Sequence, residues 1–248
     1  MGKVRIGIIR GGPSSEYDVS LLTGENVLKN LPLDKYRPYD VLISKDGVWH
    51  ENGFPSTPQK IVAKLDVAVR AIHGEFGEDG KVQQIFETHN VPYTGSGIIP
   101  SAMAMNKTIS KDIFKKAGLT VSRSIALKKD KPLAELAEQI RKNLFSPWVI
   151  KPTSRGSSIG VSIANNIPEL IGALNEAFIY DSHVLAEEFI KGREATCGVL
   201  ENFRNEKIYP MPVIEIIPPK EEMFDYKNKY NGRTREICPA NFDSETSR

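Results

Sequence analysis

The sequence predicts an open parallel α/β domain followed by an α+β region built on an antiparallel sheet. Two observations carry this prediction. Over the first hundred residues, apolar strand segments alternate with helical segments, as in folds whose parallel strands are joined by right-handed crossovers. After Lys107 the rhythm changes to shorter strands, in an order typical of sheets connected by hairpins.

Each element follows from local signals. Residues 4–9 form a nearly continuous apolar run, which favours a strand covered on both faces. The string Gly11-Gly12-Pro13 ends this strand, and Ser14 or Ser15 can cap the helix that comes next. By the same reasoning, strands are predicted at 39–43, 67–72, around Tyr93, 121–127, 148–151, just after Gly160 and 184–189, and helices at 82–88, 107–116, 132–143 and 168–178.

Composition argues against several classes of protein. Of the 248 residues, 40% are hydrophobic and 26% are charged, as in soluble globular chains. Lys and Arg total 33 against 31 Asp and Glu, and this net charge of +2 points to neither a nucleic acid nor a membrane as partner. Two cysteines are too few for a disulfide framework, and the charged N-terminus lacks the pattern of a signal peptide. We therefore expect a cytoplasmic protein.

The turn at residues 11–16 is the first candidate ligand site. A glycine-rich turn between a strand and a helix exposes backbone amides and the positive end of the helix dipole, which favour an anionic group. Glu16 adds a carboxylate that can hold an ammonium group, so the turn suits a zwitterion. The alternative is a tight turn without a ligand. A dinucleotide site is disfavoured because Gly-x-Gly-x-x-Gly is missing.

A second glycine-rich loop, residues 73–80, follows the strand predicted at 67–72. Its three glycines permit positive φ, and open α/β sheets bind ligands at the carboxyl ends of their strands. His73 is the polar candidate in this loop. The alternative is an exposed turn, in which His73 is an ordinary polar side chain and Asp79 caps the next helix.

The strongest signal is a strand that ends in Lys151 and continues through a loop of small residues to Gly160. The lysine ammonium, together with the amides and hydroxyls around Ser157 and Ser158, can surround phosphates. The order differs from the P-loop, in which the glycines precede the lysine. A flexible hairpin with a solvated lysine is the alternative.

Residues 187–194 lie at the end of another apolar strand, the one predicted at 184–189, and just beyond it. The backbone there can present a donor and an acceptor to an adenine edge, and Glu194 can accept the hydroxyl groups of a ribose. The alternative is that Glu187 and Glu188 are simply solvated, as acidic pairs at strand ends usually are.

Taken together and in this order, the four segments resemble the ATP-grasp superfamily and, within it, the D-alanine:D-alanine ligases. The resemblance covers essentially the whole chain. The strings that carry it are Gly11-Gly12-Pro13-Ser14-Ser15-Glu16 with Val19-Ser20, His73-Gly74 with Gly77-Glu78-Asp79-Gly80, Pro92-Tyr93-Thr94-Gly95-Ser96-Gly97, Met105-Asn106-Lys107, Ile150-Lys151-Pro152, Gly156-Ser157-Ser158-Ile159-Gly160, and Tyr226 with Lys229-Tyr230 and Cys238-Pro239-Ala240.

The resemblance implies an enzyme that phosphorylates the carboxylate of one D-alanine with ATP and lets the amine of a second D-alanine displace phosphate, giving a peptidoglycan precursor. It implies ATP and Mg²⁺ or Mn²⁺ as cofactors, D-alanine as substrate and a homodimer. The implied domains are a D-alanine-binding domain at 1–104, a central ATP-grasp domain at 105–186 and part of the C-terminal ATP-grasp domain at 187–248.

The resemblance also implies a role for each matching residue. Cationic groups would offset the charge of the ATP phosphates, and the serine loop would exclude water from the acyl phosphate. The implied roles are ATP binding for Lys107, Lys151, Ser157, Ser158, Glu187, Glu188, Ile190, Glu194 and Lys229, D-alanine binding for Glu16, His73, Ser157 and Tyr230, and catalysis for Glu16, Ser157 and Tyr230. In this family a tyrosine at the position of Tyr230 accompanies D-alanine as second substrate, so a dipeptide product is expected rather than one made with D-lactate.

One feature of the family is missing. Its members carry an Arg, an Asp and a Glu-x-Asn pair that bind two magnesium ions, and no Glu-x-Asn occurs in this sequence. We therefore expect no metal ligands in this chain, an incomplete C-terminal part of the ATP-grasp fold and an inactive chain when it is alone.

Two other functions remain as alternatives. An NAD-dependent oxidoreductase needs a glycine fingerprint and an acidic ribose ligand after the second strand, where Asp40 is a poor candidate. A non-catalytic ATP-grasp relative that binds nucleotides would share most of the motifs above, and it is the stronger rival.

Overall fold

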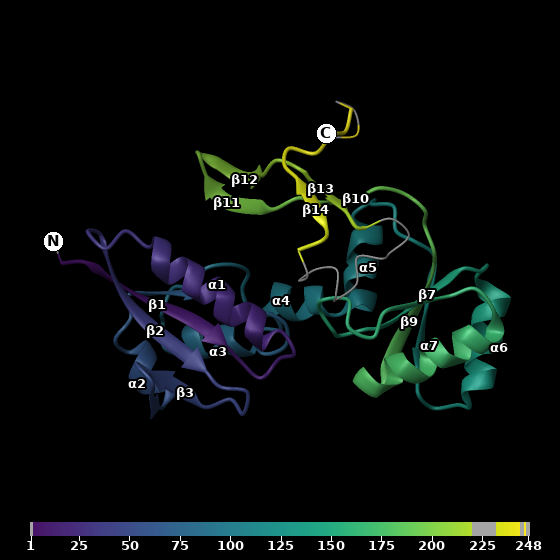
Figure 1. The fold of residues 1–248 in the computed structure, drawn as a ribbon, viewed down its shortest axis with the longest axis horizontal. Coiled ribbons are helices and arrows are strands. Elements are labelled where there is room, and N and C mark those ends of the chain that lie inside the picture. Colours follow the sequence, from purple (N-terminus) through teal and green to yellow (C-terminus); the bar gives the residue numbers. More distant parts are fainter. Residues whose placement is uncertain (1, 220–231, 244–245, 247–248) are drawn as a thin grey trace. The chain divides into compact units, whose positions relative to one another are not determined.

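A computed structural model describes residues 2–219, 232–243 and 246 (Figure 1). The chain divides into two compact units. The first comprises Met1–Val121, Pro152–Gly156 and Tyr180–Leu185, and the second comprises Ser122–Lys151, Ser157–Ile179 and Ala186–Arg248. The three domains expected from the sequence, at 1–104, 105–186 and 187–248, stay a prediction.

The first unit is built on a five-stranded sheet in the order β4-β3-β2-β1-β5. Its strands are β1 (Val4–Gly11), β2 (Tyr36–Ile43), β3 (Trp49–Glu51), β4 (Phe54–Ser56) and β5 (Val67–Arg70). Strand β1 pairs in parallel with both β2 and β5, which confirms the predicted parallel N-terminal sheet. Antiparallel pairing of β2 with β3 and of β3 with β4 adds a hairpin at one edge.

This edge hairpin is not among the predicted elements, although the sequence contains a signal for it. Asn52 and Gly53 both have positive φ, of 51° and 85°, as the two central residues of a tight hairpin turn require. Asn-Gly is the dipeptide that most favours this turn. The flanking strands have only three residues each, so they show no alternating pattern long enough to predict them.

Helices cover both faces of this sheet (Figure 1). They are α1 (Tyr17–Asn30), α2 (Pro58–Val62) and α3 (Lys81–Thr88). Helices α4 (Ile98–Met105) and α5 (Lys107–Lys116) follow in the chain, and α4 contacts α3 and α5. Ile6 and Ile8 of β1 pack with Val27 and Leu28 of α1, whereas Ile9 belongs to the cluster formed with α2 and α3. The continuous apolar run of β1 therefore has the predicted cause, a strand buried on both faces.

Two predicted details of this unit are wrong. Around Tyr93 there is a single parallel bridge to Ala68, not a strand. The N-cap of α1 is Glu16, without a side-chain cap hydrogen bond, and not Ser14 or Ser15. Ser14 is buried, and its hydroxyl donates to the carbonyl of His73 at 2.7 Å and accepts from the Glu16 amide at 3.2 Å. The side chain of Ser14 therefore joins the turn after β1 to the loop after β5.

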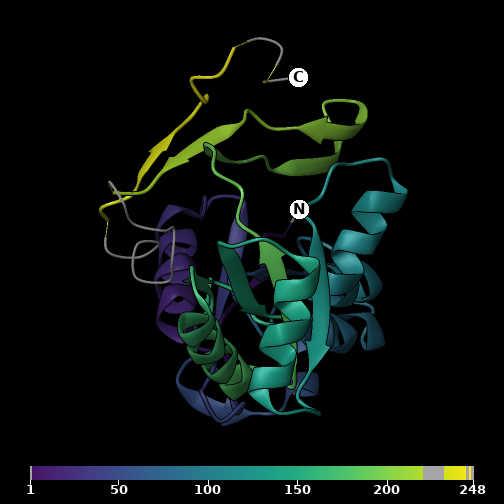
Figure 2. The ribbon, with the colours of Figure 1, turned by 90° about the vertical axis from the view of Figure 1, so that its right-hand side faces the viewer.

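A four-stranded sheet in the order β6-β9-β7-β8 carries the central part of the chain. Its elements are β6 (Ser124–Lys128), β7 (Trp148–Pro152), β8 (Ser162–Ala164) and β9 (His183–Glu188), with helices α6 (Leu133–Asn143) and α7 (Ile167–Tyr180). Strands β7 and β8 pair antiparallel, as predicted. Figure 2 shows α6 and α7 side by side on one face of the sheet. These helices contribute the buried side chains of Leu136, Ile140, Leu170 and Leu174.

The remaining strands form two small antiparallel sheets. Strands β10 (Glu194–Thr196), β13 (Ile214–Ile217) and β14 (Arg235–Ile237) pair in the order β10-β13-β14, and β11 (Val199–Phe203) pairs with β12 (Glu206–Pro210). Helices and mixed sheets thus confirm the predicted α/β class. In the described residues no helix is long and apolar enough to cross a membrane.

Candidate functional site

The residues expected to bind ligands fall into one group in each unit. In the first unit, Ser20 fixes the turn that follows β1. Its side chain is fully buried, and its Oγ accepts from the Gly11 amide at 2.7 Å and donates to the Ala71 carbonyl at 2.6 Å. Gly11 itself has a φ of +87°, and a Cβ there would lie 2.1 Å from the carbonyl oxygen of Ile43. The end of β1, helix α1 and the loop after β5 are therefore locked together.

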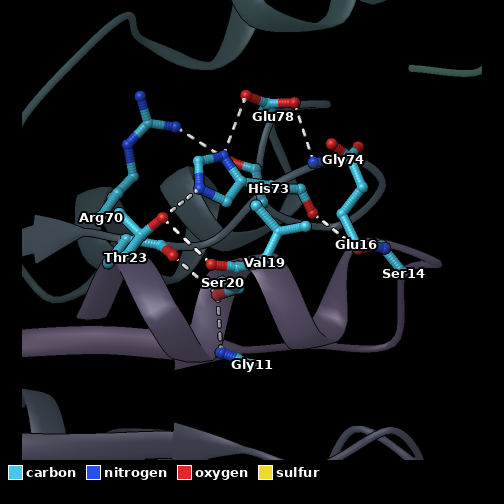
Figure 3. A network of polar contacts seen from close by, with 12 residues as sticks. Gly11, Ser14, Glu16, Val19, Ser20, Thr23, Arg70, His73, Gly74 and Glu78 are labelled. Carbon is cyan, nitrogen blue, oxygen red and sulfur yellow. Dashed lines mark hydrogen bonds and ion pairs between the residues drawn. The ribbon is translucent and has the colours of Figure 1, made fainter. Parts of the chain in front are cut away.

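This arrangement places the Glu16 carboxylate among small residues (Figure 3). Glu16 is only 7% exposed. A Cβ added to Gly74 would lie 2.7 Å from its Oε2, and one added to Gly156 would lie 3.1 Å from the same atom. Glycines at both positions therefore leave room for this buried carboxylate, and buried carboxylates are stable only with polar or cationic partners.

His73 lies in the same cluster. Its Nε2 is 2.9 Å from Thr23 Oγ1, and that hydroxyl donates its hydrogen to the Val19 carbonyl at 3.1 Å. Thr23 therefore accepts from His73 Nε2–H. His73 Nδ1 faces Glu78 Oε1 at 4.0 Å, and the other Glu78 oxygen accepts from the Gly74 amide at 2.8 Å. Glu78 thus both shapes the loop and presents a negative charge to the imidazole.

Electrostatic effects in this cluster favour the charged forms. The interaction with Glu78 raises the pKa of His73 above its ordinary value of 6.5, against the opposing effect of burial. Burial raises the pKa of Glu78, but the bonds from His73 and Gly74 outweigh it, and the net shift is downward. The two groups therefore form an ion pair more readily than isolated groups would.

Replacing Glu78 by glutamine is expected to lower the pKa of His73. The measurement is the chemical shift of its imidazole Cε1 proton against pH, with Glu138→Gln on the surface of α6 as the matched control. A raised native pKa stabilises the fold fully below pH 6.5, and this contribution disappears as the pH rises through the native value. The variant should therefore lose stability mainly on the acidic side of that range. An unchanged His73 titration would contradict the pairing.

Lys107 begins α5, with Asn106 as its N-cap. Its Nζ donates to the Arg155 carbonyl at 2.5 Å, and its amide donates to the Thr153 carbonyl at 2.9 Å.

The Lys107 side chain lines a pocket of about 420 Å³ together with Arg70, Glu78, Ser96, Ser101 and Arg155. Burial lowers the pKa of Arg70 below its ordinary value, but the group stays cationic at neutral pH. Arg155 is ion-paired with Glu75, and the Glu78 carboxylate lies in the same lining, but the three cations leave the pocket with a net positive charge that suits an anionic ligand.

In the second unit, Lys151 on β7 and Glu187 on β9 form an ion pair between neighbouring strands. The two side chains are 22% and 9% exposed. Glu188, the next residue, binds the backbone of Arg123, whose amide donates to its Oε1 at 2.7 Å. The sheet therefore orients Lys151 rigidly, whereas Glu188 has a structural contact in addition to the adenine role expected for its backbone.

A pocket of about 540 Å³ lies beyond β9, and it brings Ile190 and Glu194 together. Its apolar lining comes from Ile163, Phe189, Ile190, Ile216 and Ile217. At its edge the Arg193 Nε donates to Glu215 Oε1 at 2.7 Å, and Glu215 is 5% exposed. The bond from Arg193 lowers the pKa of Glu215. Apolar walls with a few fixed polar groups are typical of sites that bind a flat heterocycle.

The other predicted residues are placed as follows. Ser157 and Ser158 have φ values of 50° and 59°, and both are half-buried. Non-glycine residues with positive φ are uncommon and mark loops whose backbone is held by its surroundings. Lys229 and Tyr230 lie outside the described residues. In the described part of the chain no three His, Cys, Asp or Glu side chains are grouped so as to hold a metal ion.

Sequence reasoning gave no role to several residues of these pockets. Glu78 stands in a string that carries the resemblance, and the glycines around it were the only local signal. Arg70, Arg155 and Glu215 are single charged residues within ordinary-looking segments. Their positions depend on tertiary contacts, so no spacing in the sequence reveals them.

Comparison with known proteins matches both halves of the chain. The family description "D-ala D-ala ligase C-terminus" matches residues 113–248, and "D-ala D-ala ligase N-terminus" matches residues 5–60 and 50–96. A D-alanine–D-alanine ligase of Geobacter sulfurreducens is 38% identical over 246 residues, which are 98% of this chain and 71% of that protein. One of Citrifermentans bemidjiense is 39% identical over 240 residues, 96% of this chain and 71% of that protein.

Solved structures give the same result. The VanG D-Ala:D-Ser ligase of Enterococcus faecalis superposes with a TM-score of 0.82 at 29% identity, covering 99% of this chain and 79% of that one. The D-alanine–D-alanine ligase of Bacillus anthracis has a TM-score of 0.76 at 34% identity, covering 98% and 73%.

Proposed function

This chain belongs to the D-alanine–D-alanine ligase family, and from that membership and the geometry of the two groups we propose that it joins two D-alanine molecules with ATP, forming ADP and phosphate. The observation that carries the proposal is the Glu16 carboxylate, 7% exposed, in one cluster with His73. The negative charge of Glu16 suits a cationic group and not the phosphates of a nucleotide, so it favours an amino-acid ligand. This cluster suits the ammonium group of an amino acid.

In the proposed reaction a carboxylate oxygen of the first D-alanine attacks the γ-phosphorus of ATP, and ADP leaves. Lys107 and Lys151 offset the negative charge of the phosphates, and Glu16 holds the ammonium of the amino acid. The amine of the second D-alanine then attacks the acyl carbon, loses a proton and displaces phosphate. Ser157 and Tyr230 would orient this second substrate, and Lys229 would contact the γ-phosphate.

For ATP itself, the pocket lined by Ile190 and Glu194 is the proposed adenosine site. Its apolar side chains would enclose the adenine ring, and the Glu194 carboxylate would accept the ribose hydroxyls. Glu187 would contribute through its contact with Lys151. The family chemistry implies a divalent cation, but the described residues offer no cluster of His, Cys, Asp or Glu side chains that fits one.

Titration calorimetry with ATP and with D-alanine tests the proposal, using L-alanine as the control ligand. We expect the chain to bind ATP and D-alanine, and to bind L-alanine more weakly. Phosphate release with ATP, Mg²⁺ and D-alanine then measures turnover directly, and turnover by this chain alone would show that the expectation of an inactive chain, based on the missing Glu-x-Asn pair, is wrong. Binding of ATP without any binding of D-alanine would contradict the proposal and favour the non-catalytic nucleotide-binding relative.

Replacing Gly74 by alanine is expected to weaken D-alanine binding about tenfold, equivalent to ~1.4 kcal/mol. The added Cβ would stand 2.7 Å from Glu16 Oε2 and so displace the carboxylate. Gly53→Ala is the matched control, because its φ of +85° causes similar backbone strain but no atom lies within 4 Å of the new Cβ. Calorimetry on the two variants separates the contact from the strain. Equal losses in both would show that backbone strain alone is responsible.

We also propose that the protein is a homodimer in the cytoplasm, with no nucleic acid or membrane as partner. The support is the family membership together with the near-neutral charge of the sequence. Light scattering coupled to gel filtration distinguishes a dimer from the 27.6 kDa monomer.

A further inference from the structure

The residues that follow β7, Thr153 to Arg155, are called the loop root here, because they begin the loop that continues to Ser157 and Ser158. All three are tied to the short segment 180–183 that leads into β9. The Thr153 amide donates to the His183 carbonyl at 3.1 Å, and Arg155 Nε donates to the Tyr180 carbonyl at 3.0 Å. The loop root is therefore anchored at both ends.

Asp181 is the centre of this anchor. Its Oδ2 accepts from the Thr153 hydroxyl at 2.7 Å and from the Ser154 amide at 2.9 Å. Its Oδ1 accepts from the His183 amide at 3.0 Å. Thr153 is 3% exposed. A carboxylate that accepts several hydrogen bonds in a partly buried site holds its donors more tightly than a neutral acceptor would.

The protonation state of Asp181 agrees with this role. Burial raises its pKa, but the hydrogen bonds that it accepts have the larger combined effect, and the pKa lies below the ordinary value of 3.8. Asp181 is thus a carboxylate at neutral pH. Its negative charge also suits a position beside the backbone amides of the loop root.

The anchor extends to Lys107. The Lys107 amide donates to the Thr153 carbonyl, and its Nζ donates to the Arg155 carbonyl. Both acceptors belong to the loop root. The position of the Lys107 ammonium therefore depends on the backbone segment that Asp181 holds.

Resting on the function proposed above, we propose that Asp181 is a positioning residue that fixes the loop root and, through it, Lys107 for the phosphates of ATP. Asp181 acts through the residues that it holds, and no contact with ATP is assigned to it. Loss of the Asp181 carboxylate should weaken binding of the ATP phosphates. Adenosine binding should stay unchanged, because the adenosine pocket is built from residues 163, 189–194 and 215–218.

The test is calorimetry of Asp181→Asn and Thr153→Val with ATP and, separately, with adenosine. Asparagine presents an amide group to one of the three donors, so we expect ATP affinity to fall about tenfold. Thr153→Val removes one hydrogen bond without changing the volume much, and a loss of about threefold is expected. Asp34→Asn, at an exposed position of the same unit, is the control. Adenosine affinity should stay the same in all three variants.

Hydrogen exchange gives a second measurement that does not need a ligand. In Asp181→Asn the Ser154 amide should exchange faster, while the amides of β1 stay protected.

In the calorimetry, unchanged ATP affinity of Asp181→Asn, or an equal loss of affinity for ATP and for adenosine, overturns this inference alone. No ATP binding by the unsubstituted chain overturns the proposed function as well. If Asp181→Asn fails to fold, Thr153→Val decides the question.

Discussion

Replacing Lys151 by methionine is expected to lower the affinity for ATP by about 10- to 100-fold, because a hydrogen bond to a charged group contributes about 1.5–3 kcal/mol. It should also lower the melting temperature, because breaking a buried ion pair costs about 3–5 kcal/mol of stability. Methionine keeps the length of the side chain and removes the ammonium. Two effects combine in the expected result. The phosphates of ATP lose a fixed positive charge, and Glu187, whose side chain is 9% exposed, loses its partner in the sheet.

A second variant separates these two effects. In the double variant Lys151→Met with Glu187→Gln, no charge is left unpaired between β7 and β9, so the melting temperature should recover. ATP binding should not recover, because the cation is still missing. Lys128→Met at the exposed end of β6 is the matched control and should bind ATP normally. Normal ATP affinity in Lys151→Met would exclude Lys151 from the nucleotide site.

The elements that the sequence predicts well are those with a long, one-sided pattern. Helix α5 occupies Lys107–Lys116, the predicted range, because its first residue follows the cap Asn106 and Gly118 follows its end. Strand β1 is predicted because it is apolar on both faces. The hairpin β3–β4 is missed because strands of three residues carry too short a pattern, even though Asn52-Gly53 marks the turn.

The residues of the candidate site likewise differ in how well the sequence predicts them. Glu16, His73 and Lys151 stand in glycine-rich strings, where the local chemistry of a turn or a strand end indicates a ligand. The partners of these residues are not local. Glu187 reaches Lys151 only because β7 and β9 are neighbours in the sheet, and Asp181 reaches Thr153 across 28 residues of sequence. Sheet order is a property of the whole fold, so a single sequence does not reveal these pairs.

Replacing Glu16 by glutamine is expected to lower the affinity for D-alanine by about 10- to 100-fold, since a hydrogen bond to a charged group contributes about 1.5–3 kcal/mol. The substitution conserves shape and removes only the charge. An ammonium group bound in this cluster would then lose its counterion in a site where water is largely excluded. Affinity for ATP should change little, because Glu16 is proposed to contact the amino acid and not the nucleotide.

The control for this variant lies on the same helix. Glu25 forms an exposed ion pair with Lys29, and Glu25→Gln should leave D-alanine affinity unchanged. Calorimetry with D-alanine and with D-lactate sharpens the test, since D-lactate has a hydroxyl where D-alanine has the ammonium. If Glu16 holds the ammonium, the substitution should remove most of the preference for D-alanine over D-lactate. If Glu16→Gln still prefers D-alanine to D-lactate, another group recognises the amine. The next pair to substitute would then be His73 and Glu78, because their charges lie in the same cluster.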